Sequence, residues 1–173
     1  MFMNGMPADK ISLENAKKDK LFYVVFNVVV FRDSDKKCLI LKRSEEEKAH
    51  PGKYGVIGGK MEWGDFDLKK PSRINGDVLD YENVVKDVLK REAIEEAGIE
   101  IQDNLKYINS IGFIRPDGIP CFLLKFAGKY KSGEVKLEES FSDFKWINAS
   151  EIEKFDCIDG IKEEIRETIY LFS

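Results

Sequence analysis

The chain has 173 residues, of which 43% are hydrophobic, and a formal net charge of −4. A chain of this size buries one hydrophobic core, so we expect a single domain at 21–173 after a polar N-terminal leader at 1–20. No apolar run is long enough to span a membrane, and the leader lacks the apolar centre of a signal peptide. Acidic and basic residues are mixed along the chain, which argues against an extended nucleic-acid surface.

The chain contains three cysteines and one histidine, at Cys38, Cys121, Cys157 and His50. Widely spaced cysteines in odd number are typical of reduced thiols, which predicts a cytoplasmic protein without a cysteine-based metal site. A single histidine argues against a His-rich zinc site and against a Ser-His-Asp triad.

The first half of the chain has the pattern of β-strands. Residues 21–31 are almost all apolar and favour a central strand covered on both faces, followed by a turn and a returning strand at 37–42. A charged loop leads to a further strand at 54–57. Asn27 interrupts the first apolar run, and two interpretations stay open: its amide is satisfied by a neighbouring segment, or it contacts a bound base.

The second half of the chain alternates helix and strand patterns. A helix is predicted to begin at Asp80 or Tyr81 and to end at Gly98, a residue type that often terminates helices. Strands are predicted near 105–114, 120–130 and 144–147. Beyond Asp159, apolar residues at helical spacing predict an amphipathic terminal helix that packs on the core. These residues are Ile158, Ile161, Ile165, Ile169 and Phe172.

The helix before Gly98 carries carboxylates where its inward face should be apolar. Its apolar stripe continues at helical spacing into three glutamates: Val85, Val88 and Leu89, then Glu92, Glu95 and Glu96. Two carboxylates 4 Å apart repel by about 4 kcal/mol at an effective dielectric constant of 20. Arg91 can offset one charge, and a hard cation such as Mg²⁺ can offset more. The alternative is an ordinary solvated face rich in glutamate.

Two segments together resemble the Nudix box, G-x5-E-x7-R-E-U-x-E-E-x-G-U, where U is aliphatic. Every specified position of its second half matches Arg91 to Ile99. In the first half Gly59 matches, but Asp65 replaces the glutamate. The spacer from Asp65 to Arg91 has 25 residues, 18 more than the pattern. A registration starting at Gly76 leaves a spacer one residue too long. We prefer Gly59, because Gly-Gly-Lys-x-Glu-x-Gly after a strand resembles the usual lead-in of the family.

This resemblance implies an α/β fold, the Nudix-type α/β/α sandwich with a mixed β-sheet. It implies a hydrolase that cleaves the pyrophosphate linkage of a nucleoside diphosphate derivative, such as a nucleoside triphosphate, ADP-ribose or a similar small nucleotide. Mg²⁺ or Mn²⁺ would be bound by Glu92, Glu95, Glu96 and the carbonyl of Gly58, with a carboxylate as general base. Arg91 would orient the glutamates through salt bridges. A homodimer is a family-level expectation.

Further site residues follow less directly from the resemblance. Family members often recruit another carboxylate before a late strand, where Glu139 is favoured over Glu138. Asp65 is one methylene shorter than glutamate, so we expect its contact to a metal or to Arg91 to be lost or to pass through water.

Candidate substrate-binding residues are Arg43, Lys60 and Arg73. Arg73 lies in the insertion at 66–80, which reads as a turn-rich loop. This loop either closes over the phosphates or is a tolerated surface excursion. Trp63 is a candidate for stacking on a base.

Two other classes of protein fit parts of the sequence. One is a catalytically inactive Nudix-like module that senses or binds a nucleotide, although such a module needs no complete glutamate set. The other is an interaction protein with an acidic helix, which the change from apolar to acidic residues on one face argues against.

Overall fold

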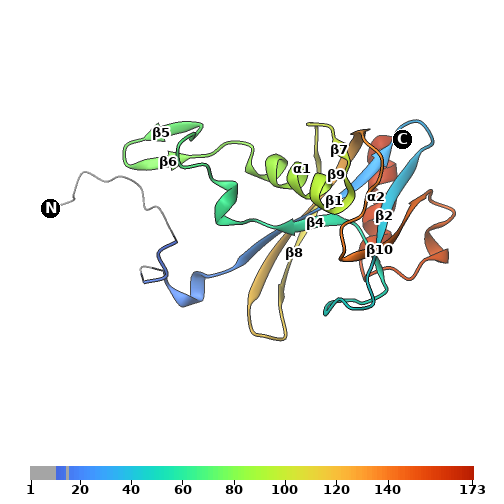
Figure 1. The fold of residues 1–173 in the computed structure, drawn as a ribbon, viewed down its shortest axis with the longest axis horizontal. Coiled ribbons are helices and arrows are strands. Elements are labelled where there is room, and N and C mark those ends of the chain that lie inside the picture. Colours follow the sequence, from blue (N-terminus) through green and yellow to red (C-terminus); the bar gives the residue numbers. More distant parts are fainter. Residues whose placement is uncertain (1–10, 15) are drawn as a thin grey trace.

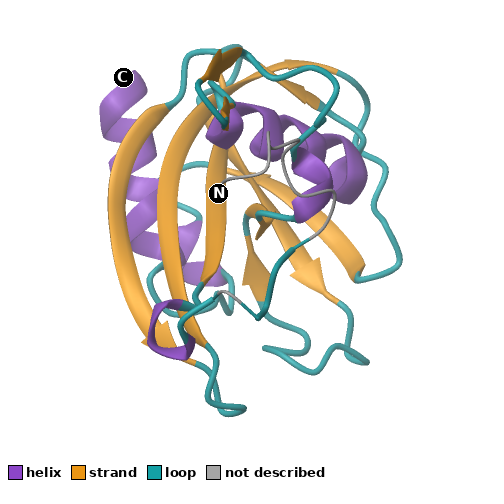
Figure 2. Ribbon diagram, turned by 90° about the vertical axis from the view of Figure 1, so that its left-hand side faces the viewer, coloured by secondary structure: helices purple, strands orange, loops and turns teal. Residues whose placement is uncertain are grey.

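The computed structural model describes residues 11–14 and 16–173, and within them the chain forms a mixed β-sheet with a helix on each face (Figure 1, Figure 2). The predicted leader at 1–20 lies partly outside the described residues. Lys18–Lys20, at its end, form the short 3-10 helix η1, whose side chains are exposed. Two more 3-10 helices follow, η2 (Trp63–Asp65) and η3 (Ile152–Lys154).

Eight strands of the described chain form the main sheet. They are β1 (Tyr23–Arg32), β2 (Lys37–Arg43), β3 (Tyr54–Gly55), β4 (Ile57–Lys60), β7 (Glu100–Ile101), β8 (Lys106–Ile114), β9 (Pro120–Ser132) and β10 (Phe141–Ile147). The order is β10-β2-β1-β9-β7, with β3 beside β2, β4 beside β1 and β8 beside β9. β1 and β9 run parallel, whereas the other pairs are antiparallel.

β1 is covered on both faces, as its continuous apolar run predicted. Because side chains alternate along a strand, Phe26 and Val28 are buried on the side of α1 (Val84–Ala97). Val29 and Phe31 are buried on the other side, with residues of α2 (Ile161–Phe172). Each buried apolar side chain contributes about 1.5–3 kcal/mol. The arrangement confirms the expected α/β/α sandwich with a mixed sheet.

Helix α1 begins later than its sequence pattern indicated. The predicted start at Asp80 or Tyr81 is wrong, because residues up to Asp80 pair within a hairpin and the helix begins at Val84. Asn83 precedes it in the left-handed conformation, at φ 64°. The helix ends at Gly98 as predicted. Gly98 has φ 65° and donates its N–H to the carbonyls of Ala93 and Ile94.

The insertion at 66–80 is not wholly a loop. It contains β5 (Arg73–Asn75) and β6 (Val78–Asp80), an antiparallel pair separate from the main sheet. Gly76 turns this hairpin with φ 62°, a conformation that favours glycine. Figure 1 shows the hairpin at one end of the long axis, away from the main sheet.

The remaining elements lie close to their predicted positions. The predicted strand at 54–57 is divided into β3 and β4, whereas β9 and β10 are slightly longer than expected. The terminal helix is confirmed as α2, with Ile161 and Ile165 buried. None of the helices among the described residues is long and apolar enough to cross a membrane. Cys38, Cys121 and Cys157 are free and buried.

Candidate functional site

Two adjacent glycines of β4 face opposite sides of the sheet, and each makes room for a different polar side chain. A Cβ on Gly58 would lie 2.2 Å from Asn27 Oδ1. A Cβ on Gly59 would lie 1.9 Å from Glu92 Oε1, which belongs to α1. Both distances are far inside van der Waals contact, so any side chain at either position would displace its neighbour. The glycine pair is therefore required by close approach on both faces.

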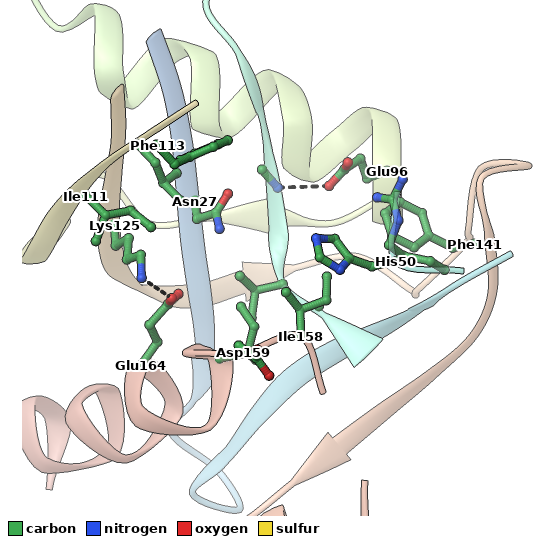
Figure 3. A pocket seen from close by; sticks show the side chains of 16 residues that line it. Asn27, His50, Glu96, Ile111, Phe113, Lys125, Phe141, Ile158, Asp159 and Glu164 are labelled. Atoms are coloured by element: carbon green, nitrogen blue, oxygen red, sulfur yellow. Dashed lines mark hydrogen bonds and ion pairs between the residues drawn. The ribbon is translucent and has the colours of Figure 1, made fainter. Parts of the chain in front are cut away.

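Asn27 lines a pocket of about 350 Å³ (Figure 3). The lining is partly apolar and includes Ile111, Phe113 and Ile158, with polar groups between them. Cavities of this kind, apolar with a few placed polar groups, are typical of small-molecule sites. Glu96, one of the predicted metal ligands, also lines this pocket.

A buried ion pair forms part of the pocket lining. Lys125 Nζ lies 2.7 Å from Glu164 Oε1, and the two side chains are 8% and 3% exposed. Lys125 comes from β9 and is the register partner of Asn27 on β1, so the two residues lie side by side. Glu164 comes from the first turn of α2.

Sequence reasoning missed this ion pair, although each partner leaves a signal. Lys125 interrupts an apolar stretch of a predicted central strand. Glu164 falls on the buried side of the terminal helix, directly before Ile165 and three residues after Ile161. A charged residue on each of two buried elements suggests a pair, but residues 39 positions apart in sequence give no indication that they meet.

Glu96 joins the pocket to the acidic end of α1. The backbone N–H of Gly58 donates to Glu96 Oε2 at 3.0 Å. Burial raises the pKa of Glu96 to about 8 against the opposing effect of this hydrogen bond, and the charges of Glu92 and Glu138 raise it further. The carboxylate is thus held beside the glycine pair at a site where its negative charge is costly.

Glu92 is the most buried of the three predicted glutamate ligands, at 8% exposure. Burial raises its pKa, while the positive charge of Arg91 opposes that effect. Glu95, by contrast, is exposed and lies against Arg91. The structure therefore places Glu92 against Gly59 and Glu96 against the backbone N–H of Gly58, and leaves Glu95 at the edge of the group.

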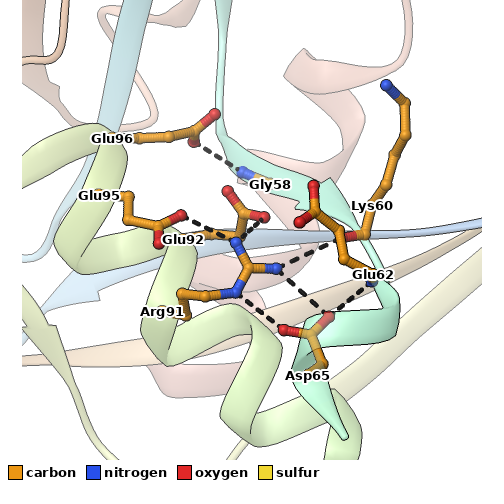
Figure 4. Close-up of polar contacts among 8 residues, drawn as sticks. All are labelled: Gly58, Lys60, Glu62, Asp65, Arg91, Glu92, Glu95 and Glu96. Carbon is orange, nitrogen blue, oxygen red and sulfur yellow. Dashed lines mark hydrogen bonds and ion pairs between the residues drawn. The ribbon is translucent and has the colours of Figure 1, made fainter. Parts of the chain in front are cut away.

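Arg91 contacts three carboxylates (Figure 4). Its Nε donates to Asp65 Oδ1 at 2.9 Å, and its Nη1 lies 2.9 Å from Glu92 Oε1 and 2.8 Å from Glu95 Oε2. Burial opposes the positive charge, but the hydrogen bonds to Asp65 and Glu95 outweigh it and raise the pKa of Arg91. This geometry suits a residue that orients glutamates.

The expectation that Asp65 would lose its contact with Arg91, or make it through water, is wrong. The contact is direct, and the Asp65 side chain is only 10% exposed. η2 offsets the shorter side chain by carrying Asp65 toward α1, and Asp65 Oδ2 accepts the N–H of Glu62 at 2.7 Å within this turn.

Of the two acidic residues before β10, Glu138 rather than Glu139 contacts the site. The backbone N–H of Glu138 donates to the carbonyl of Glu96 at 3.2 Å, and the Glu138 carboxylate accepts a hydrogen bond from Ser140. Glu139 is exposed and makes no polar contact with the rest of the described chain. Its predicted role as a ligand stays a prediction, and the geometry favours its neighbour.

The predicted substrate-binding residues lie in three different places. Arg43 lines the pocket, where its Nε donates to the carbonyl of Ala49 at 2.7 Å. Lys60 ends β4 with its Nζ 5.4 Å from the ring centre of Tyr23. Arg73 pairs with Asp80 inside the β5–β6 hairpin and is not among the pocket residues.

Trp63 does not line the pocket either. It packs against Phe66, with ring centres 6.2 Å apart, and is partly exposed. The Phe66 ring in turn lies 5.2 Å from that of Tyr81 at the other end of the insertion. The role of Trp63 supported by these contacts is to anchor the inserted segment.

The donor atoms of the site fit a hard divalent cation, although no three acidic, His or Cys side chains of the described chain converge on one point. The available ligands are carboxylate and carbonyl oxygens, which Mg²⁺ and Mn²⁺ prefer. Burial raises the pKa of both Glu92 and Glu96, so their negative charges lack sufficient compensation from Arg91 alone. A divalent cation held by these carboxylates would supply it.

The chain belongs to the Nudix hydrolase family. The model of the NUDIX domain matches residues 22–168, which includes both halves of the box, all of α1 and the first two thirds of α2. No curated protein matches the chain in sequence.

Solved structures share the fold at low sequence identity. The MutT protein from Methanosarcina mazei Go1 is 17% identical with a TM-score of 0.61, over 91% of this chain and 99% of that chain. The NUDIX domain of Shewanella oneidensis NrtR, solved with ADP-ribose, is 14% identical with a TM-score of 0.67, over 93% and 96%. A NUDIX-family hydrolase from Clostridium perfringens is 14% identical with a TM-score of 0.62, over 87% and 97%.

Proposed function

We propose that this protein is a Mg²⁺- or Mn²⁺-dependent hydrolase that cleaves the pyrophosphate linkage of a small nucleoside diphosphate derivative. The observation that carries this proposal is the position of Glu96. Its carboxylate lines the 350 Å³ pocket and also lies close enough to Glu92, one helical turn away on α1, for the two negative charges to interact. A nucleotide in the pocket would therefore place its phosphates beside the carboxylates that suit a divalent cation.

In this proposal Glu92, Glu96, Glu95 and the carbonyl of Gly58 hold the cation. When bound there, the cation neutralises phosphate charge and lowers the pKa of a bound water, so that hydroxide is available near neutral pH. Arg91 positions Glu92 and Glu95 through the ion pairs that it makes with both. The remaining catalysis is positioning and charge stabilisation, as in other phosphoryl transfer reactions.

The pocket accounts for binding of the nucleoside part. Its apolar side chains exclude water and suit a flat base, while Arg43, which is paired with Glu47, lies on the same lining. The NUDIX domain of Shewanella oneidensis NrtR was solved with ADP-ribose, which supports a small nucleotide as the class of ligand. The absence of a basic surface in the sequence composition also favours a small nucleotide over RNA.

The test is phosphate release from a panel of nucleotide derivatives with Mg²⁺ or Mn²⁺, with a coupled phosphatase for monoester products. Glu96→Gln keeps the shape of the side chain but removes its charge, so we expect kcat to fall about 100-fold or more. The matched control is Glu100→Gln on β7, which changes an exposed carboxylate that pairs with Lys131. We expect this control to retain the activity of the wild type.

Two results would overturn the proposal. Turnover that Glu96→Gln leaves unchanged would remove the acidic group from the reaction. Tight nucleotide binding without turnover on any substrate or metal would instead identify a nucleotide-sensing module.

A further inference from the structure

The Lys125–Glu164 ion pair has no evident structural purpose that an apolar pair would not fulfil. Both residues are almost fully buried, and desolvation of two charges offsets much of their mutual attraction. Well-packed apolar residues at such positions are commonly as stable as a buried ion pair. Because the pair lines the candidate substrate pocket, its charges are available for recognition of a ligand.

The hydrogen-bonding capacity of the pair is only partly used. A lysine ammonium group has three donors, and Lys125 Nζ has one partner among the described residues, Glu164 Oε1. On the other side of the pair, Glu164 Oε2 is buried and has no partner within the described part of the chain. Burial accordingly raises the pKa of Glu164, while the hydrogen bond from Lys125 opposes this effect. Lys125, which lines the pocket, therefore retains donors for an additional acceptor.

Asn27 lies beside these donors. β1 and β9 run parallel with Asn27 opposite Lys125, so both side chains project from the same face of the sheet. Figure 3 shows Asn27 and Lys125 next to each other, with Phe113 and Ile111 of β8 nearby. The side-chain amide of Asn27 can donate and accept, whereas the ammonium group of Lys125 can only donate. Beside Asn27, the ammonium group of Lys125 therefore supplies donors to a ligand and no acceptor.

Nucleobases differ in what they present to such donors. A 6-oxopurine or a 4-oxopyrimidine presents a carbonyl oxygen with two lone pairs, next to a ring N–H. The oxygen can accept from Lys125 and from the Asn27 amide together, and the ring N–H can donate to Asn27 Oδ1. A 6-aminopurine or a 4-aminopyrimidine places an NH₂ group at that position, so its donors face the donors of Lys125.

We propose that Lys125, held in place by Glu164, is a specificity-determining residue that selects nucleotides with a 6-oxopurine or 4-oxopyrimidine base over those with the corresponding amino base. The inference rests on the proposed function, because it assigns the pocket to the nucleoside part of the substrate. The predicted preference for oxo bases depends on Lys125 and not on the three predicted glutamate ligands of α1.

The test is binding of nucleoside monophosphates by isothermal titration calorimetry without divalent metal, so that the readout does not depend on catalysis. Inosine and adenosine monophosphate are a matched pair that differs at the purine 6-position, and uridine and cytidine monophosphate differ in the same way at the pyrimidine 4-position. We expect the oxo member of each pair to bind about 10-fold to 100-fold more tightly, the range for a hydrogen bond to a charged group.

Three variants locate the source of the preference. Lys125→Met keeps the length of the side chain and removes the donors, so we expect the two members of each pair to bind within about threefold of each other. Because this change leaves Glu164 buried without its partner, Lys125→Met/Glu164→Gln removes both charges and is expected to give the same result in a folded protein. Glu164→Gln alone retains the donors of Lys125 and should retain the preference.

The matched control is Lys129→Met, on the same strand. Lys129 pairs with Asp33 at the surface and is not a pocket residue. Thermal unfolding of all four variants establishes which of them are folded before binding is compared.

The outcomes separate the two proposals. Equal binding of oxo and amino nucleotides by the wild type, or a preference that survives in the folded double variant, overturns the role of Lys125 and leaves the hydrolase proposal standing. Failure of every monophosphate to bind overturns the role of Lys125, because the pocket would then not hold the nucleoside part, whereas the hydrolase proposal is decided separately by the turnover assay.

Discussion

At the scale of single residues, the site depends on the absence of side chains as much as on their presence. Gly58 approaches Asn27 and Gly59 approaches Glu92, each at a distance that leaves no room for a Cβ. Glu96 accepts a hydrogen bond from the backbone N–H of Gly58 and also lines the pocket. Even a methyl group at Gly58 or Gly59 should therefore displace a side chain of the candidate site.

We expect Gly59→Ala to reduce kcat about 100-fold, because the new methyl group would displace the Glu92 carboxylate by an ångström or more. The free energy of unfolding should also fall by about 1–3 kcal/mol, as for other overpacked sites. The measurements are steady-state hydrolysis and urea unfolding. Gly64→Ala is the matched control in the same segment, since a Cβ there meets no atom within 4 Å. Equal effects of the two variants would contradict the prediction.

At the scale of elements, the β5–β6 hairpin is set apart from the main sheet. The residues of β5 are all exposed, and the hairpin forms a sheet of its own. Its connection to the body passes through the Trp63–Phe66–Tyr81 aromatic contacts. This arrangement favours the interpretation of the insertion as a surface excursion over that of a lid.

We expect Arg73→Ala to leave KM unchanged, because its guanidinium group pairs with Asp80 and lies outside the pocket. Loss of this largely exposed ion pair should change stability by less than about 1 kcal/mol. Arg43→Ala, which removes a pocket-lining charge, should raise KM in the same assay. A raised KM for the Arg73 variant would show instead that the hairpin reaches the bound substrate.

The elements also show what sequence alone can and cannot provide. Apolar periodicity located β1, α1 and α2 because their buried faces repeat along the chain. The hairpin was missed because strands of three residues with exposed side chains leave no such pattern. The start of α1 was misplaced for the same reason, since residues 78–80 can extend a helix pattern but pair in β6 instead.

The site was predictable where its residues are close in sequence. Arg91, Glu92, Glu95 and Glu96 follow from one helix. The ion pair of Lys125 and Glu164 was not predicted, since only the packing of α2 on the sheet brings the two residues together.

At the scale of the whole molecule, two side chains that keep their protons in the folded state should make the protein less stable at alkaline pH. Burial raises the pKa of the Cys38 thiol to about 12, from an ordinary value of 9.0. Burial, followed by the hydrogen bond to Asp143, raises the pKa of Tyr54 to about 12 from 10.0. In both cases the folded protein holds a proton that the unfolded chain releases first. The stabilisation that these two groups contribute is therefore fully present below about pH 9 and is lost as the pH rises toward 12.

We expect the free energy of unfolding to fall between pH 8 and pH 11, with a contribution from Cys38 on the order of 1–3 kcal/mol. Urea unfolding at the two pH values measures this loss. Cys38→Ala should show a smaller loss than the wild type, although its stability at pH 8 is lower because of the deleted sulfur atom. An identical pH dependence in the two proteins would rule out the buried thiol as its source.

The parallel pairing of β1 with β9 has a consequence for how the protein is made. Tyr23 lies opposite Cys121, so the central strand meets its neighbour only after nearly a hundred further residues have been synthesised. Such distant partners raise the contact order and slow folding, because a large loop must close before the contacts form. During translation, the edge of β1 that pairs with β9 stays unpaired until β9 has been synthesised. Over that time the apolar strand is exposed to aggregation and to chaperones.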